Sequence, residues 1–192
     1  MADTTNPKTL RSHGRLSIRA SVQPRDLMAE APRLKGAWTA RVITLFPEAF
    51  PGVLGASLTG KALQDGLWHL ETIPLREFGE GKHRNVDDTP TGGGAGMVLR
   101  ADIVDAALSR AAEGTVPALW PVVYLSPRGR PFTQSMARAF AGGEGMTLLC
   151  GRFEGVDERV LQHRQVLEVS LGDFVLTGGE IAAQALIDAT VR

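Results

Sequence analysis

Short apolar runs alternate along most of the chain with segments of helical spacing. Five runs rich in aliphatic or β-branched side chains are bounded by Gly, Pro or charged residues, which is typical of buried strands. They are ARVITLF (40–46), LWHLETIPL (67–75), LWPVVYLS (119–126), MTLLC (146–150) and QVLEVS (165–170). Strands that alternate with helices predict an α/β domain with a mostly parallel sheet and flanking helices.

Between these runs, apolar side chains recur every three or four residues, as on one face of a helix. The segments are ASLTGKALQDG (56–66), RADIVDAALSRAAE (100–113), PFTQSMARAFA (131–141), DERVLQH (157–163) and GGEIAAQALIDATVR (178–192). Pro131 and Asp157 are typical of helix starts. In the last segment, Ile181, Ala185 and Ala189 share one face and no Gly or Pro stop follows, so we expect a helix that is cut at the last residue.

Two stretches show no sustained apolar period. Residues 1–37 mix Pro, Ser, Thr and Arg, so we expect a disordered N-terminal extension, followed by one domain over residues 38–192. Residues 76–97 are predicted to form a long loop, of the kind that is usually functional or mobile. This loop contains RNVDDTPTGGGAGM (84–97), in which two carboxylates precede a run of glycines.

The charges are balanced overall but unevenly spread. Lys and Arg total 21, as do Asp and Glu, and residues 1–40 contain seven basic and three acidic side chains, which leaves 14 basic and 18 acidic side chains in the rest. A mildly acidic body argues against binding of nucleic acid by bulk phosphate neutralisation. An RNA partner would therefore contact local basic segments, such as GKHR (81–84) and PRGR (127–130).

The apolar runs and the cysteine content bear on location. No apolar run approaches the roughly 18 residues that a membrane span requires, so no membrane association is expected. The single cysteine, Cys150, lies in an apolar run and has no internal disulfide partner. A buried, inert thiol in a reducing, cytoplasmic compartment is the natural interpretation.

Familiar phosphate and hydrolase motifs are absent from the sequence. The glycines at 92–96 do not complete G-x-G-x-x-G, because Met97 holds the last place, and no P-loop lysine follows. The sequence contains neither G-x-S-x-G nor H-E-x-x-H, and its four histidines are too far apart for a local metal signature. Hydrolase and metalloenzyme functions therefore lose their usual support.

Three glycine-bearing segments remain, each following a predicted strand. They are YLSPRG (124–129), CGRFEG (150–155) and SLGDFVLTGGE (170–180). Open parallel sheets bind ligands at the carboxyl ends of their strands, and glycines let backbone groups approach a ligand closely. Each segment alone is better explained as a tight turn, whereas the three together shift the balance towards a ligand site.

Six segments carry a resemblance to one known family. They are LFPEAF (45–50), KHRNVDD (82–88), GGGAGM (92–97), YLSPRG (124–129), CGRFEGVDERV (150–160) and GDFVLTGGE (172–180). In this order and spacing, from about Arg41 to Arg192, the chain resembles the bacterial tRNA (guanine-N1)-methyltransferases of the TrmD type. The resemblance implies a SPOUT fold with a C-terminal trefoil knot. It also implies a homodimer whose active site straddles the interface, and a C-terminal tRNA-binding domain that is absent from this chain.

The resemblance further implies S-adenosylmethionine (S-adenosyl-L-methionine) as the cofactor and N1 of guanosine 37 in tRNA, within the anticodon stem-loop, as the target. It leaves open whether Mg²⁺ assists. The residues that match the family's cofactor-binding positions are Tyr124, Leu125, Ser126, Pro127, Gly151, Phe153, Glu154, Ser170, Leu171, Gly172, Phe174, Leu176, Gly178 and Gly179.

The chemistry indicates what the catalytic residues must do. Neutral guanine carries a proton on N1, so methylation there needs a base for that proton and a donor for the charge that grows on O6. By motif, Arg192 would be the donor and Glu154 would contact the cofactor or the target guanine. The family's base is an aspartate beyond residue 192. From sequence alone, a surface residue at a helix end is the favoured explanation of Arg192.

Four residues of the long loop are expected to orient the substrate. By the same resemblance these are His83, Arg84, Asp87 and Asp88, although the two aspartates are also explained as turn caps. Two other functions stay open for the chain as a whole. One is a truncated module that binds the cofactor and dimerises without turnover, and the other is a related knotted methyltransferase that acts on a different RNA.

Overall fold

The computed structural model describes residues 35–192. The predicted extension over residues 1–37 falls outside the described residues, apart from its last three positions. Within the described part, five strands form one sheet in the order β2-β1-β6-β5-β7, and every pairing between neighbours is parallel. The strands are β1 (Trp38–Thr44), β2 (Trp68–Pro74), β5 (Val122–Pro131), β6 (Gly145–Cys150) and β7 (Leu167–Ser170). The prediction of an α/β fold with a mostly parallel sheet is confirmed.

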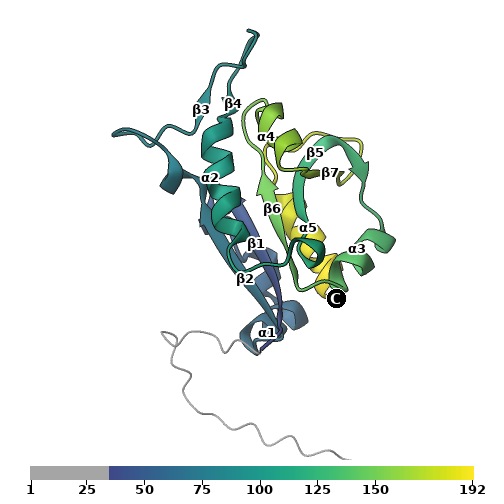
Figure 1. Cartoon of the computed structure of the whole chain (residues 1–192). Coiled ribbons are helices and arrows are strands. Elements are labelled where there is room, and N and C mark those ends of the chain that lie inside the picture. The colour runs from purple at the N-terminus through teal and green to yellow at the C-terminus, as the bar shows by residue number, and fades with distance from the viewer. Residues whose placement is uncertain (1–34) are drawn as a thin grey trace, which may run out of the picture. The chain divides into compact units, whose positions relative to one another are not determined.

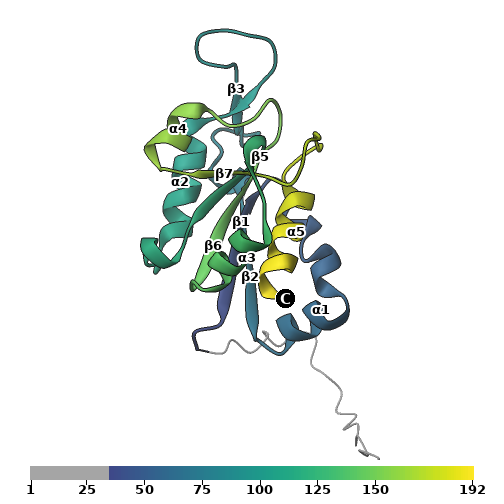
Figure 2. The same ribbon diagram turned by 90° about the vertical axis from the view of Figure 1, so that its right-hand side faces the viewer.

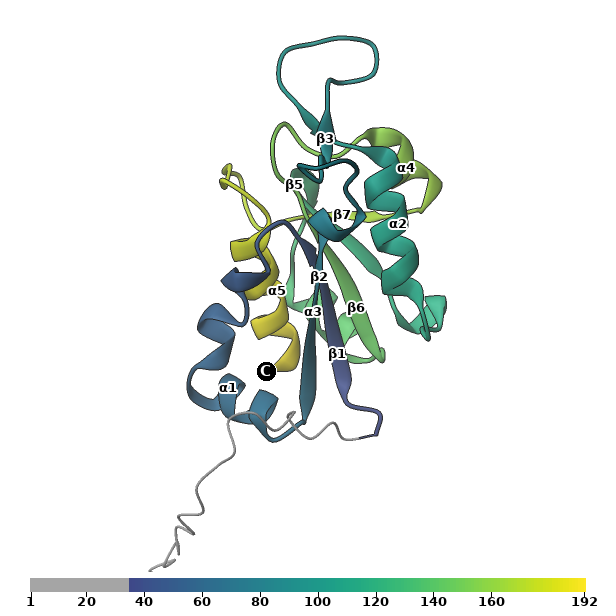
Figure 3. The ribbon, with the colours of Figure 1, turned by 90° about the vertical axis from the view of Figure 1, so that its left-hand side faces the viewer.

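Helices cover both faces of this sheet (Figures 1 and 3). They are α1 (Ser57–Gln64), α2 (Ala101–Ala112), α3 (Gln134–Ala141), α4 (Glu158–His163) and α5 (Glu180–Val191). One buried cluster lies between the sheet and helices α2 and α4, and the other lies on the opposite face with α3 and α5. No helix among residues 35–192 is long and apolar enough to cross a membrane.

The central strand β6 shows why the predicted strands are continuous apolar runs and do not alternate apolar with polar residues. All six of its residues are buried, because helices pack on both of its faces. Leu149 belongs to the cluster on the α2 side, whereas Leu148 and Cys150 belong to the cluster on the α5 side. Cys150 is fully buried, as predicted, and burial raises the pKa of its thiol well above its usual value.

One sequence-based detail is wrong. Pro131 does not start a helix but ends β5, and α3 begins after Thr133, whose hydroxyl accepts a hydrogen bond from the Met136 N–H at 3.3 Å. The sequence pattern did not predict which face of α5 is buried. In the structure Ile181 is 64% exposed, and the buried face is formed by Ala182, Ala183, Leu186, Ile187 and Thr190. Both sides of α5 are apolar, so periodicity alone could not tell which side meets the sheet.

The predicted loop over residues 76–97 contains more order than expected. It begins within a 3-10 turn, η3 (Leu75–Phe78), and includes β3 (Asp87–Asp88), which pairs antiparallel with β4 (Val98–Leu99). A parallel bridge between Leu99 and Val156 ties the end of this hairpin to the segment after β6. The glycine run is therefore anchored at both of its ends.

The segment between β7 and α5 changes position across the sheet. Strand β7 lies at the sheet edge beside β5, whereas α5 packs against β1 and β6. Residues 171–179 must therefore pass over the carboxyl ends of β5 and β6, above the start of α5 (yellow in Figure 2). The Gly179 N–H donates a hydrogen bond to the Gly151 carbonyl at 3.1 Å, which joins this crossing to the segment after β6.

Candidate functional site

A cleft of about 500 Å³ lies at the carboxyl ends of β5, β6 and β7. The three glycine-bearing segments singled out in the sequence supply its walls, at the edge where open parallel sheets bind ligands. Every residue that was assigned by motif to cofactor binding lines it, namely Tyr124, Leu125, Ser126, Pro127, Gly151, Phe153, Glu154, Ser170, Leu171, Gly172, Phe174, Leu176, Gly178 and Gly179. Their role as a cofactor site stays a prediction.

The first wall comes from an irregularity in β5. The pairing of β5 with β7 shifts register between Leu125 and Arg130, so the intervening residues bow out of the sheet. Gly129 is needed at this bulge, because a Cβ there would lie 2.5 Å from the backbone nitrogen of Val169. The Tyr124 ring is buried beneath this wall, and burial raises the pKa of its hydroxyl.

The second wall follows β6 and turns sharply before α4. Phe153 has a φ of 57° and Gly155 a φ of 123°, both in the left-handed region. The Asp157 carboxylate then caps α4 by accepting the Arg159 N–H at 3.0 Å. A side-chain hydrogen bond from Arg159 lowers the pKa of Asp157.

The end of the glycine run in the long loop is hydrogen-bonded to this second wall. The Glu154 N–H donates to the Met97 carbonyl at 2.9 Å, and the Leu99 N–H donates to the Gly155 carbonyl at 2.9 Å. At Gly96, a Cβ would lie 2.4 Å from the Glu154 Cγ, so only glycine leaves room for this carboxylate. The long loop thus shares a border with the cleft through Glu154.

The third wall is the segment that crosses from β7 to α5. The Ser170 hydroxyl donates to the Gly172 carbonyl at 2.9 Å, and its oxygen lies 3.2 Å from the Gly172 N–H, which tightens the turn after β7. Phe174 and Val175 follow with exposed fractions of 52% and 84%. Large apolar side chains are therefore exposed at this edge of the cleft.

Several glycines of the cleft are required by packing of its own walls. A Cβ at Gly151 would meet the Tyr124 ring at 2.8 Å, and a Cβ at Gly179 would meet the Cys150 Cα at 2.7 Å. At Gly178, the space for a Cβ is taken by Arg152. Close approach of a ligand is therefore not the only reason for glycine at these positions.

Sequence reasoning missed some charged residues of the cleft. Arg152 and Glu158 line it but were not singled out, and Arg128 was named only as part of the basic segment PRGR (127–130). Arg128 forms ion pairs with Glu158 and, at 2.9 Å, with Glu168, and hydrogen bonds to these two carboxylates raise its pKa. The only sequence signal for these residues was their position within the glycine-bearing motifs.

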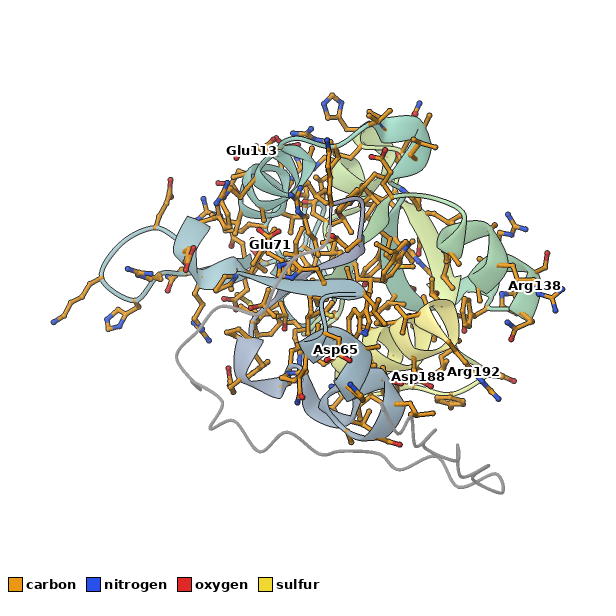
Figure 4. The ribbon with its side chains drawn as sticks, turned by 90° about the horizontal axis from the view of Figure 1, so that it is seen from below. Asp65, Glu71, Glu113, Arg138, Asp188 and Arg192 are labelled. Carbon is orange, nitrogen blue, oxygen red and sulfur yellow. The ribbon has the colours of Figure 1, made fainter. Side chains whose placement is uncertain are left out.

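Arg192 does not reach the cleft of its own chain. It follows α5, whose 12 residues span about 18 Å, and the cleft lies at the other end of that helix. Figure 4 shows Arg192 beside Asp188, at the far end of α5. The geometry within one chain therefore separates Arg192 from Glu154, the other residue assigned a catalytic role.

The four residues assigned to the substrate also lie outside the cleft lining. Asp87 and Asp88 form β3, and the Asp88 carboxylate accepts the Thr89 N–H at 2.7 Å. This contact is to the next residue, one position short of an Asx-turn, so the turn-capping alternative for Asp88 stays a prediction. His83 and Arg84 are exposed in the turn that precedes β3.

Metal binding has no support in the described part of the chain. Among residues 35–192, no three His, Cys, Asp or Glu side chains come together as a metal site would require.

Comparison with known proteins adds to this geometry. The model of the family described as tRNA (Guanine-1)-methyltransferase TrmD matches residues 39–192. A curated tRNA (guanine-N(1)-)-methyltransferase of Cereibacter sphaeroides is 77% identical over 161 residues, which are 83% of this chain and 65% of the relative. Proteins of the same name from Ruegeria pomeroyi and Brucella suis are 69% and 53% identical, over 86% of this chain and 68% and 66% of their own lengths. The chain thus spans about two thirds of these relatives.

Proposed function

Because the chain belongs to the tRNA (guanine-1)-methyltransferase family, we propose that it is the cofactor-binding part of an enzyme that methylates N1 of guanosine 37 in tRNA. The observation that carries this proposal is the meeting of three strand-end segments in one cleft, at the motif positions that the resemblance assigns to S-adenosylmethionine. A tRNA substrate makes the cytoplasm the expected location.

The residues of the cleft fit such a cofactor. Its volume of about 500 Å³ is within the range of small-molecule sites. Leu125, Leu171 and Leu176 offer apolar surface for an adenine ring, while Ser126 offers a hydroxyl. The Glu154 carboxylate suits the positive charge of the cofactor's methionine part or a polar edge of the target guanine.

The proposed reaction divides the work among a few groups. When bound, S-adenosylmethionine supplies a methyl group on a sulfonium, which the guanine N1 attacks. The cleft walls hold the two reactants close together and keep water out. An arginine donor at guanine O6 favours loss of the N1 proton by holding the growing negative charge, and the proton passes to an aspartate carboxylate, the base that the resemblance implies.

We assign that donor to Arg192 of a second copy of the chain. Arg192 lies ten residues, or about 15 Å along α5, beyond Ala182, the last residue of this helix that lines the cleft, so it can serve a cleft only across an interface. The exposed Phe174, Val175 and Ile181 beside the cleft are apolar surface of the kind that such an interface buries. This supports a homodimer with shared sites.

The long loop is proposed to orient the anticodon stem-loop. His83 and Arg84 carry its exposed basic surface, and its far end is hydrogen-bonded to the cleft wall at Glu154. Asp87 and Asp88 are held in the β3–β4 hairpin between these two regions. A tRNA bound at the basic end would therefore lie next to the cofactor.

We also propose that the crossing over residues 171–179 completes a trefoil knot. In support, the crossing runs over the ends of β5 and β6, and α5 packs beyond it against β1. Gly179 fits closely against the backbone of Cys150 at this point. Glycine there allows two chain segments to pass at van der Waals distance.

The proposal is tested first by calorimetric titration of S-adenosylmethionine into the purified chain. Saturable binding near one cofactor per chain, abolished by Gly178→Trp, supports the cleft as the site. Absence of binding contradicts it. Gly142→Trp, a substitution at the exposed end of α3 and away from the cleft, is the matched control.

Methyl transfer is tested on tRNA transcripts with G37 or A37, beside the full-length Cereibacter sphaeroides relative. Transfer by this chain to the G37 transcript alone supports the complete reaction. Because the chain spans about two thirds of its relatives, a second candidate is a binding module without turnover, and cofactor binding without transfer would support that one. Methylation mapped by mass spectrometry to another nucleoside would indicate a knotted methyltransferase with a different RNA target.

A further inference from the structure

A buried carboxylate beneath the cleft has no part in the proposed reaction. Glu180 is only 4% exposed, although it carries a charge. It is the first residue of α5, where the helix dipole favours a negative side chain. Charged side chains are rarely buried in proteins unless they are paired, so the partners of the Glu180 carboxylate indicate why it is buried.

Two segments that are distant in sequence meet on this carboxylate. The Thr44 hydroxyl, at the end of β1, donates to the Glu180 Oε1 at 2.8 Å. The Arg152 guanidinium, from the segment after β6, donates to the Glu180 Oε2 at 2.8 Å and to Oε1 at 3.4 Å. Charge-assisted contacts of this two-pronged form are both strong and orienting.

The same guanidinium reaches the third wall of the cleft. Its remaining terminal nitrogen donates to the Thr177 carbonyl at 3.3 Å, within the crossing segment. The Phe46 ring covers it, with the guanidinium carbon 4.4 Å from the ring centroid. Arg152 is thereby bound to the carboxylate, to the crossing segment and to an aromatic face at once.

The arrangement joins two walls of the cleft through one charge. Arg152 and Thr177 line the cleft, whereas Glu180 and Thr44 do not. Glu180 therefore does not contact a ligand in the cleft, and it can act only by fixing where the crossing segment and the post-β6 segment lie. Gly178 belongs to the same arrangement, because the Arg152 guanidinium occupies the space that a Cβ at this position would need.

We propose that Glu180 and Arg152 are positioning residues, which hold residues 171–179 against residues 151–155 in the conformation that accepts the cofactor. This inference rests on the proposed function, since it takes S-adenosylmethionine as the ligand of the cleft. A well-packed apolar pair in the same place would stabilise the fold at least as well as a buried ion pair. An apolar pair would not, however, fix the orientation of the two segments as the two-pronged contact of the guanidinium does.

The substitution Glu180→Gln tests this role with little change of shape. The amide keeps an acceptor for the Thr44 hydroxyl but removes the charge that holds Arg152. We expect calorimetry to show about tenfold weaker binding of S-adenosylmethionine, the usual effect of losing one charge-assisted hydrogen bond. The matched control is Glu71→Gln, which removes the 2.9 Å ion pair with Arg41 outside the cleft lining and should leave the affinity unchanged.

A double-mutant cycle separates positioning from stability. If Glu180 acts through Arg152, the variant that combines Glu180→Gln with Arg152→Met binds the cofactor no more weakly than Arg152→Met alone. Thermal unfolding of each variant without cofactor is measured alongside, because a merely structural pair would lower the midpoint and leave the affinity unchanged. Arg152→Lys, which keeps a charge but not the two-pronged contact, should bind more weakly than the wild type and supplies the comparison if Glu180→Gln does not fold.

The outcomes distinguish the two proposals. If the wild-type chain does not bind S-adenosylmethionine, both proposals are overturned. If it binds, and Glu180→Gln or Arg152→Lys binds as tightly as Glu71→Gln, only the positioning role is overturned. Additive losses of affinity in the cycle also contradict it, since they would mean that the two residues act independently.

Discussion

Replacing Gly178 by alanine tests whether the space at this position is reserved for the Arg152 guanidinium. A Cβ at Gly178 would lie 2.2 Å from the Arg152 Nε and 2.6 Å from the Glu180 Oε2, so one of the groups must move. Gly178 is not among the glycines with positive φ. Alanine therefore introduces a steric conflict without backbone strain, which makes the result easy to interpret.

The magnitude follows from the ion pair that the methyl group displaces. Breaking a buried pair so that one charge stays uncompensated costs about 3–5 kcal/mol. The Arg152 side chain is 23% exposed and the Glu180 side chain 5%, so we expect the lower end, about 3 kcal/mol. For a domain of this size, that corresponds to a fall in the midpoint of thermal unfolding of roughly 6–12 °C.

The assay is thermal unfolding of the wild type, Gly178→Ala and a control, followed by circular dichroism. The control is Gly142→Ala, because Gly142 has a φ of −76° and a Cβ there would meet its nearest atom at 3.5 Å. Alanine at Gly142 should change stability by no more than about 1 kcal/mol. In an Arg152→Met background, Gly178→Ala should lose most of its effect, and an undiminished effect in that background would refute the reasoning.

Three further predictions concern single groups. Gly151→Ala should weaken binding of S-adenosylmethionine about tenfold or more in calorimetry, because the new Cβ, 2.8 Å from the Tyr124 ring, pushes this ring toward the cleft; unchanged affinity would contradict the packing argument. Asp105 accepts hydrogen bonds from Arg164 that lower its pKa, so the stability it contributes is complete above its unfolded pKa, near 3.8, and disappears as the pH falls through the lower folded pKa. The difference in thermal midpoint between the wild type and Asp105→Asn should therefore be larger at pH 7 than at pH 2, and an equal difference would show that the ion pair contributes nothing. The Cys150 thiol should not react with a disulfide reagent at pH 8 until the chain is unfolded by guanidinium, and rapid reaction of the native chain would contradict its complete burial.

The sequence predicted the strands well because each has a local cause. Strands such as β6 are buried on both faces, and this requires a continuous apolar run that is visible without any structure. The end of β6 at Cys150 and the start of α4 after Asp157 were similarly marked by glycine and by a capping carboxylate. Since parallel strands end at one edge, the meeting of the three glycine-bearing segments could also be anticipated.

The sequence was less informative where a segment fits two structures equally well and only its long-range contacts decide between them. Both sides of α5 are apolar, so the choice between Ile181 and Leu186 as the buried side depended on β1 and β6, which lie far away in the chain. Pro131 could start a helix or end a strand, and the pairing of β5 with β7 decided for the strand. Local propensity is too weak to decide such cases against long-range packing.

The sequence by itself determined an α/β domain, the strand-end segments that line its cleft and, by resemblance, the family. Only the tertiary structure decided that Arg152, Glu180 and Thr44 converge beneath that cleft, and that Arg192 lies at the far end of α5 from it. The physical reason is the range of the interactions. Strands, caps and turns depend on residues a few positions apart, whereas Thr44 and Glu180 are separated by 136 positions and meet only because the chain crosses back over the sheet.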